Sequence, residues 1–135
     1  MDKQWTLYED LDSILYSEAQ LKEAVAQLGE RITRDYQGKK PVMVCILKGA
    51  SVFFCDLIRQ IDLPLEIDFM VVSSYGSGTS TSGEVQLVKD LGRSVNGRDV
   101  IVVEDIVDSG CTLSYLKKVL DSRGVSSLRI CSLLD

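Results

Sequence analysis

Three carboxylate side chains, Glu104, Asp105 and Asp108, lie close together in the stretch VIVVEDIVDSGCTL that begins at Val100. The first two directly follow an apolar run, where a buried strand is expected to reach solvent. Like charges this close repel one another unless a cation or hydrogen-bond donors stabilise them. Two neighbouring carboxylates suit the paired hydroxyls of a ribose, either directly or through a Mg²⁺ ion bound to a phosphorylated sugar. A solvated acidic turn is the alternative interpretation.

Four small residues, Ser109, Gly110, Cys111 and Thr112, follow these acids and precede a helical pattern that begins at Leu113. Free N–H groups at a helix N-terminus, two hydroxyls and a glycine that permits close approach together suit a phosphate monoester. The alternative is an ordinary strand-to-helix turn in which Ser109 or Thr112 caps the helix.

The sequence contains no histidine. Ser-His and Cys-His nucleophilic pairs, His-ligated zinc and histidine general bases are therefore excluded. Asp108 is the only one of the three acids that lies beyond the expected strand end, so we expect it to accept or donate a proton. The alternative is that Asp108 only caps the following helix. Without a histidine partner, Cys111 is interpreted as a small loop residue and not as a nucleophile.

The elements that must position these residues alternate between helix and strand. A helix is expected from Ser17, its N-cap, to Tyr36, and Gly38 with Pro41 ends it. Strands are expected at 42–47, 65–72, 84–90, 99–103 and 127–134, and further helices from Ser51 and over 112–123, with Gly124 as the C-cap of the latter. The alternation predicts one doubly wound α/β domain over residues 1–135, with a largely parallel sheet.

Ligands of an open α/β sheet bind beyond the carboxyl ends of its strands. Three segments are expected there: Lys48 with Gly49, the Ser/Thr/Gly-rich segment 73–84, and the segment 104–112. The topology brings them together, although none is decisive alone. Taken separately, Lys48 fits a solvated lysine in a turn, and residues 73–84 fit a surface loop without a role.

The composition limits the class of protein. The 135 residues carry a net charge of −5 and are 45% hydrophobic, which suits one globular core and argues weakly against a nucleic-acid partner. The four cysteines, which have no CxxC spacing, are expected to be reduced core residues. No apolar run approaches membrane-spanning length, so we expect a soluble, cytoplasmic protein without a membrane partner.

The stretch VVEDIVDSGCTL resembles the phosphoribosyl-diphosphate signature of type I phosphoribosyltransferases. The stretches YSEAQLKEAVAQLGERITRDYQGK, VCILKGASVFFCDLIRQI and IDFMVVSSYGSGTSTSGEVQLVKDL resemble the hypoxanthine (hypoxanthine-guanine) phosphoribosyltransferases, in the same order and at similar spacing. The similarity runs from about Leu11 to Asp135. It implies the type I phosphoribosyltransferase fold, a mostly parallel twisted sheet flanked by helices on both faces.

Such an enzyme moves ribose 5-phosphate from phosphoribosyl diphosphate to a 6-oxopurine, hypoxanthine or guanine, through a transition state that resembles an oxocarbenium ion. The resemblance implies that Ser109, Gly110, Cys111 and Thr112 hold the 5-phosphate. Glu104 and Asp105 would contact the ribose hydroxyls and help to place Mg²⁺. Asp108 would face the imidazole nitrogen of the base as the catalytic acid or base.

The resemblance also assigns the other two segments. Lys48 and Gly49 would bind pyrophosphate, after a cis peptide bond between Leu47 and Lys48. Ser74 and Tyr75 would begin a flexible lid over residues 73–84, which excludes water that could otherwise hydrolyse the ribosyl cation.

In the resembling family, the chain continues for several tens of residues that supply a lysine, an aromatic side chain and a late acid to the base pocket. We therefore expect residues 1–135 to be a truncated domain with little purine specificity, and a homo-oligomer, dimer or tetramer. Two alternatives stay open. One is a regulator of the same fold that binds phosphoribosyl diphosphate and nucleic acid, and the other is a receiver-like nucleotide-binding module.

Overall fold

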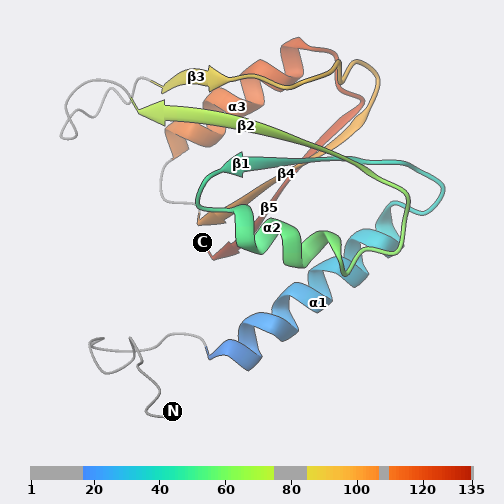
Figure 1. The fold of residues 1–135 in the computed structure, drawn as a ribbon. Helices are drawn as coiled ribbons and strands as arrows, with labels where there is room; N and C mark the ends of the chain where they lie inside the picture. The colour runs from blue at the N-terminus through green and yellow to red at the C-terminus, as the bar shows by residue number, and fades with distance from the viewer. Residues whose placement is uncertain (1–16, 75–84, 107–109, 135) are drawn as a thin grey trace, which may run out of the picture.

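The computed structural model describes residues 17–74, 85–106 and 110–134. Its elements are α1 (Glu18–Asp35), β1 (Val42–Leu47), α2 (Ser51–Ile58), β2 (Glu66–Ser74), β3 (Val85–Lys89), β4 (Asp99–Ile106), α3 (Gly110–Ser122) and β5 (Ser127–Leu134). The strands form one sheet in the order β3-β2-β1-β4-β5, in which only β3 is antiparallel to its neighbour. The predicted α/β architecture is confirmed, and Figure 1 shows α1 and α2 on one face of the sheet with α3 on the other.

The apolar strands β1 and β4 form the centre of the molecule because helices cover both faces of the sheet. Successive side chains of a strand point to opposite faces. Met43 and Cys45 accordingly pack in the cluster beneath α1 and α2, whereas Val42 and Val44 pack in the cluster beneath α3. A strand buried on both faces reads as a continuous apolar run, which is why VMVCIL identified β1 from sequence.

Helix α1 begins with the predicted cap. The Ser17 hydroxyl accepts a hydrogen bond from the Gln20 backbone N–H at 3.1 Å, and the Gln20 side chain accepts one from the Ser17 N–H at 2.8 Å. This capping box satisfies two N–H groups that a helix leaves unpaired. Further along, Gly29 lies so close to the turn that follows α2 that a Cβ there would come within 2.4 Å of the Gln60 Cβ. The Thr33 hydroxyl donates to the Gly29 carbonyl at 2.8 Å and accepts from the Asp62 N–H at 2.9 Å.

Several predicted boundaries were wrong. Strand β2 does not end at Val72 but continues to Ser74, into the segment predicted as a lid, because Ser73 and Ser74 pair with Gln86 and Val85 of β3. Strand β4 does not end at Val103 but continues to Ile106, because Glu104 and Ile106 remain in register with Ser132 and Leu134 of β5. Backbone pairing with a neighbouring strand, which the polarity of side chains does not reveal, decides where this strand ends. Helix α3 begins at Gly110 and not at Thr112.

The three cysteines whose side chains the structure describes divide into two groups. Cys45 and Cys131 are buried and unbridged, as predicted, and burial raises the pKa of the Cys131 thiol. Cys55 is exposed on α2, so its assignment to the core was wrong. Within the part of the chain that the structure describes, no helix has the length and apolar character needed to cross a membrane.

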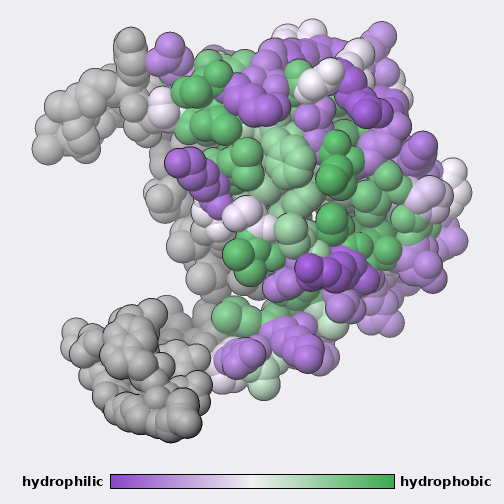
Figure 2. Space-filling view, in the orientation of Figure 1, coloured by the Kyte–Doolittle hydropathy of each residue, from purple (hydrophilic) through white to green (hydrophobic). Residues whose placement is uncertain are grey.

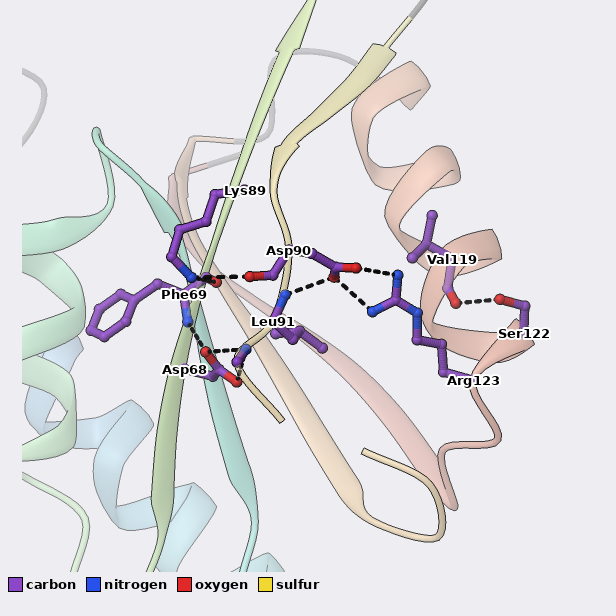
Figure 3. Close-up of polar contacts among 9 residues, drawn as sticks. Asp68, Phe69, Lys89, Asp90, Leu91, Val119, Ser122 and Arg123 are labelled. Carbon is purple, nitrogen blue, oxygen red and sulfur yellow. Dashed lines mark hydrogen bonds and ion pairs between the residues drawn. The ribbon is translucent and has the colours of Figure 1, made fainter. Parts of the chain in front are cut away.

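One buried carboxylate fixes the outer part of the sheet. Asp68 in β2 is only 7% exposed, and it accepts hydrogen bonds from the N–H of Phe69 at 2.8 Å and of Gly92 at 2.9 Å (Figure 3). Gly92 belongs to the connection between β3 and β4, so this side chain ties that connection to β2.

A second carboxylate joins the starts of three strands. Glu66, at the beginning of β2, accepts a hydrogen bond from Arg98 at 2.7 Å and forms ion pairs with Arg93 at 3.2 Å and Lys40 at 3.7 Å. The hydrogen bond from Arg98, followed by the charges of Arg98, Arg93 and Lys40, lowers the pKa of the Glu66 carboxyl although desolvation raises it.

Candidate active site

Several of the predicted site residues lie on one edge of the sheet because four parallel strands end there. In Figure 1 the arrowheads of β1, β2, β4 and β5 all point to the same side of the molecule. Lys48 directly follows β1, and Ser74 is the last residue of β2. Glu104 lies two residues before the end of β4. Neighbouring strands are about 4.8 Å apart, so these positions from distant parts of the sequence form one rim.

The turn between β1 and α2 presents Lys48 and Gly49 to solvent. Both residues are exposed, whereas the next residue, Ala50, is only 1% exposed and packs in the core. The Ser51 N–H donates to the Lys48 carbonyl at 3.1 Å, and the Phe54 N–H donates to the Ala50 carbonyl at 2.8 Å. The peptide bond between Leu47 and Lys48 is cis, which confirms the expectation drawn from the resemblance. The turn therefore offers a cationic side chain on a backbone that the core holds in place.

Strand β4 brings Glu104 to the rim on a defined face. Val100 and Val102 pack in the cluster beneath α3, and the alternation of a strand places Glu104 on that same face. Its side chain is half-buried, directly after the fully buried Val103. A carboxylate at neutral pH accepts hydrogen bonds and binds hard cations, so Glu104 is suited to hydroxyl groups or to Mg²⁺.

Helix α3 starts at this rim and is anchored by its apolar face. Leu116 and Leu120 are about 1% and 0% exposed and pack against the sheet. The first turn contains Gly110 and the half-buried Thr112. N–H groups in a first helical turn lack partners within the helix and attract anions. A phosphate bound here would lie on the same face of the sheet as Glu104.

Some predicted site residues cannot be placed in this geometry. Tyr75, Asp108 and Ser109 lie outside the described residues, and Ser74, Asp105, Gly110 and Cys111 are described only by their backbone. Within the ranges 17–74, 85–106 and 110–134, the described Cys, Asp and Glu side chains form no group of three that could hold a metal ion. The expected Mg²⁺ site at Glu104 and Asp105 thus stays a prediction.

A hollow of about 530 Å³ between α1 and β5 was not foreseen from sequence. Leu28 and Ile32 of α1 and Cys131 of β5 line it, with Arg129 among its polar residues. Arg129 already donates to Asp35 at 3.0 Å, so its charge is largely compensated. None of the described residues that line this hollow is a predicted site residue, and we assign it no part in the site.

Comparison with known proteins identifies the family. The family model for the phosphoribosyl transferase domain matches residues 13–135. A hypoxanthine-guanine phosphoribosyltransferase of Streptococcus thermophilus is 48% identical over 129 residues, which is 96% of this chain and 72% of that protein. The chain belongs to the phosphoribosyl transferase domain family. The alternative of a receiver-like module is therefore wrong.

Solved structures of this phosphoribosyltransferase family agree with the fold. The crystal structure of a hypoxanthine phosphoribosyltransferase from Staphylococcus aureus matches with a TM-score of 0.88 and 47% identity, covering 93% of this chain and 68% of that one. A hypoxanthine phosphoribosyltransferase from Trypanosoma cruzi in a ternary substrates complex matches with a TM-score of 0.85 and 33% identity, covering 93% and 72%.

The phosphoribosyltransferase domain also occurs within longer relatives. A bifunctional TilS/HprT protein of Listeria monocytogenes is 48% identical over 130 residues. The match covers 96% of this chain but only 20% of that protein. The relatives of Streptococcus thermophilus and Staphylococcus aureus are named as phosphoribosyltransferases, and the alternative of a nucleic-acid-binding regulator is not supported.

Proposed function

We propose that the chain forms the phosphoribosyl-diphosphate site of a purine salvage enzyme. The reaction transfers ribose 5-phosphate to hypoxanthine, and also to guanine, and yields IMP or GMP with pyrophosphate. The observation that supports this most is the rim itself, where an exposed lysine turn, a half-buried carboxylate and a helix N-terminus adjoin. The names of the relatives that match almost the whole chain point to the same reaction.

The charges at the rim suit a sugar that carries phosphates at both ends. The cation of Lys48 and the backbone beside Gly49 would bind the pyrophosphate group. The first turn of α3 would bind the 5-phosphate, with Ser109 and Thr112 as hydroxyl donors. Between these two anion sites, Glu104 would accept hydrogen bonds from the ribose hydroxyls. Its negative charge would also stabilise the positive charge that develops on the ribose.

The chemical step needs a proton acceptor and the exclusion of water. As the purine nitrogen bonds to the anomeric carbon, the bond from that carbon to pyrophosphate breaks and its electron pair leaves with the pyrophosphate. Asp108 would take the proton that the purine imidazole releases. Ser74 and Tyr75 would begin the lid over residues 73–84 that keeps water from the reacting carbon.

A magnesium ion fits the residue types at the rim. Glu104 provides the hard oxygen ligands that Mg²⁺ prefers, and Asp105 is the next residue of the same strand. These two residues would hold the ion, which supplies positive charge to the pyrophosphate leaving group. We further propose that the protein acts in the cytoplasm as a single domain that assembles into a dimer or tetramer.

Formation of IMP from hypoxanthine and phosphoribosyl diphosphate tests the proposed function. We expect the Lys48→Ala variant to raise the KM for phosphoribosyl diphosphate at least about tenfold, because a charge-assisted bond to phosphate is lost. Lys22→Ala is the matched control, since Lys22 is an exposed lysine on α1, and it should leave the KM unchanged. Because the relatives are longer, the assay includes a chain extended at its C-terminus with the corresponding residues of the Streptococcus thermophilus relative. If neither chain converts any 6-oxopurine, the proposed reaction is wrong.

A further inference from the structure

An ion pair joins the edge strand β3 to the far end of α3. The two guanidinium nitrogens of Arg123 donate to the two carboxylate oxygens of Asp90 at 2.6 and 2.7 Å (Figure 3). The N–H of Leu91 donates to the same carboxylate at 2.6 Å. Arg123 directly follows α3 and Asp90 directly follows β3, so this two-bond contact crosses between elements that lie 33 positions apart in sequence.

The Asp90 side of this contact is itself firmly connected to the sheet. The Lys89 ammonium donates to the carbonyls of Asp90 at 3.0 Å and of Phe69 at 3.2 Å, which joins the end of β3 to β2. Leu91 packs in the apolar cluster beneath α3. The anchor to which Arg123 binds is therefore part of the sheet and not a loose surface side chain.

The pair is charged on both sides at neutral pH. The hydrogen bonds from Arg123 lower the pKa of the Asp90 carboxyl, as do the Leu91 N–H and the charges of Arg123 and Lys89, against the desolvation that raises it. The Asp90 side chain is 46% exposed and that of Arg123 is 33% exposed. Exposed ion pairs usually contribute little to stability, but a bidentate arginine–carboxylate pair is fixed in both distance and orientation.

The direction of α3 makes this contact relevant to the rim. The helix has 13 residues, so its ends are about 20 Å apart. One end contains the first turn at the rim, and Arg123 lies at the other. A helix of this length behaves as a rod, so a sideways shift at Arg123 changes the direction in which the N–H groups of the first turn point. Binding sites require placement within about 0.5 Å.

We propose that Asp90 and Arg123 are positioning residues that hold α3 in the orientation in which its first turn receives the 5-phosphate of the substrate. This inference rests on the proposed function, and it assigns the pair no contact with substrate. It differs from a purely structural role in one measurable respect. Loss of the pair should weaken the binding of the phosphate group that contacts α3. It should leave unchanged the binding of the group that contacts the Lys48 turn, which belongs to another element.

The test compares two ligands on the full chain, ribose 5-phosphate and inorganic pyrophosphate, each titrated calorimetrically in the presence of Mg²⁺. Asp90→Asn removes the charge while it keeps the shape of the side chain. We expect it to weaken the binding of ribose 5-phosphate about two- to thirtyfold, the range typical of residues that act on a site from a distance, and to leave the affinity for pyrophosphate unchanged. Arg123→Lys, which keeps the charge but loses the two-bond geometry, should act in the same direction.

Asp121→Asn is the matched control. Asp121 pairs with Lys117 at 2.8 Å within α3, so its loss breaks an ion pair of the same helix that does not reach the sheet. It should change neither affinity. Circular dichroism establishes that each variant is folded, and Arg123→Lys serves as the test if Asp90→Asn does not fold.

The positioning role would be wrong if folded variants lost affinity for both ligands equally, or if they bound ribose 5-phosphate as tightly as the wild type. Either result would leave the proposed function intact. A wild-type chain that binds neither ligand would overturn the proposed function, and this inference with it.

Discussion

Replacement of Asp68 by alanine should destabilise the fold more than any surface substitution. Of the described residues, Asp68 is the only polar or charged side chain that is buried. Its carboxylate accepts from the N–H groups of Phe69 and Gly92 and so ties the connection after β3 to β2 (Figure 3). Alanine removes the acceptor and leaves the half-buried Phe69 N–H without this partner.

The expected loss follows from these contacts. A hydrogen bond to a charged acceptor contributes about 1.5–3 kcal/mol, so two such bonds correspond to about 3–6 kcal/mol. Gly92 is exposed, and water can replace its bond, which reduces the expected loss to about 2–4 kcal/mol. At about 3 °C per kcal/mol for a domain of this size, the midpoint of thermal unfolding should fall by about 6–12 °C. Asp68→Asn keeps one acceptor oxygen and should lose about half as much.

Urea unfolding followed by far-UV circular dichroism measures this loss directly. The matched control is Asp62→Ala, because Asp62 is an exposed aspartate whose backbone N–H, and not its side chain, bonds to Thr33. The control should stay within about 0.5 kcal/mol of the wild type. If Asp68→Ala is as stable as Asp62→Ala, the buried carboxylate does not hold the connection in place and the reasoning is wrong.

Substitutions at three further positions test other contacts. Gly29→Ala should destabilise by about 1–2 kcal/mol, despite the higher helix propensity of alanine, because its Cβ would meet Gln60; a more stable variant in urea would show that α1 and α2 are farther apart. Thr33→Val should cost about 1 kcal/mol by removing the hydroxyl that bridges α1 to the connection after α2, and Thr33→Ser should restore it. The pKa of Glu66 is lowered in the folded state, chiefly by the hydrogen bond from Arg98. The stabilisation from this carboxylate is therefore fully present above the unfolded pKa. It is lost as the pH falls through the lower folded pKa. Glu66→Gln should therefore flatten the decline of unfolding free energy below about pH 4.5, and an unchanged acid profile would contradict this assignment.

Much of the fold could be predicted from local pattern. The run VMVCIL predicted a strand covered on both faces, and Ser17 predicted the start of α1, because burial and capping leave a direct trace in neighbouring residues. The end of β4 could not be found this way. The strand ends with Glu104, Asp105 and Ile106, and the two acids resemble the start of a loop. Backbone pairing with β5 decides the boundary instead.

The position of the candidate site could be predicted from sequence, but the contacts that hold its elements in place could not. The rule that ligands bind beyond the carboxyl ends of parallel strands placed Lys48 and Glu104 together, and the structure brings their elements to one rim. The pair between Asp90 and Arg123 has no local signal, because its members lie 33 positions apart and each resembles an ordinary surface charge. Such contacts depend on how elements pack, which periodicity does not specify. The roles of individual residues came from the family resemblance and not from spacing.

Calorimetric titration of the chain with phosphoribosyl diphosphate and Mg²⁺ tests the central claim most directly. The account predicts saturable binding at one site per chain, displacement by pyrophosphate, and at least about tenfold weaker binding in Glu104→Gln, which keeps the shape of the side chain but removes its charge. A wild-type chain that is folded but shows no saturable binding, or a Glu104→Gln variant that binds as tightly as the wild type, would contradict it.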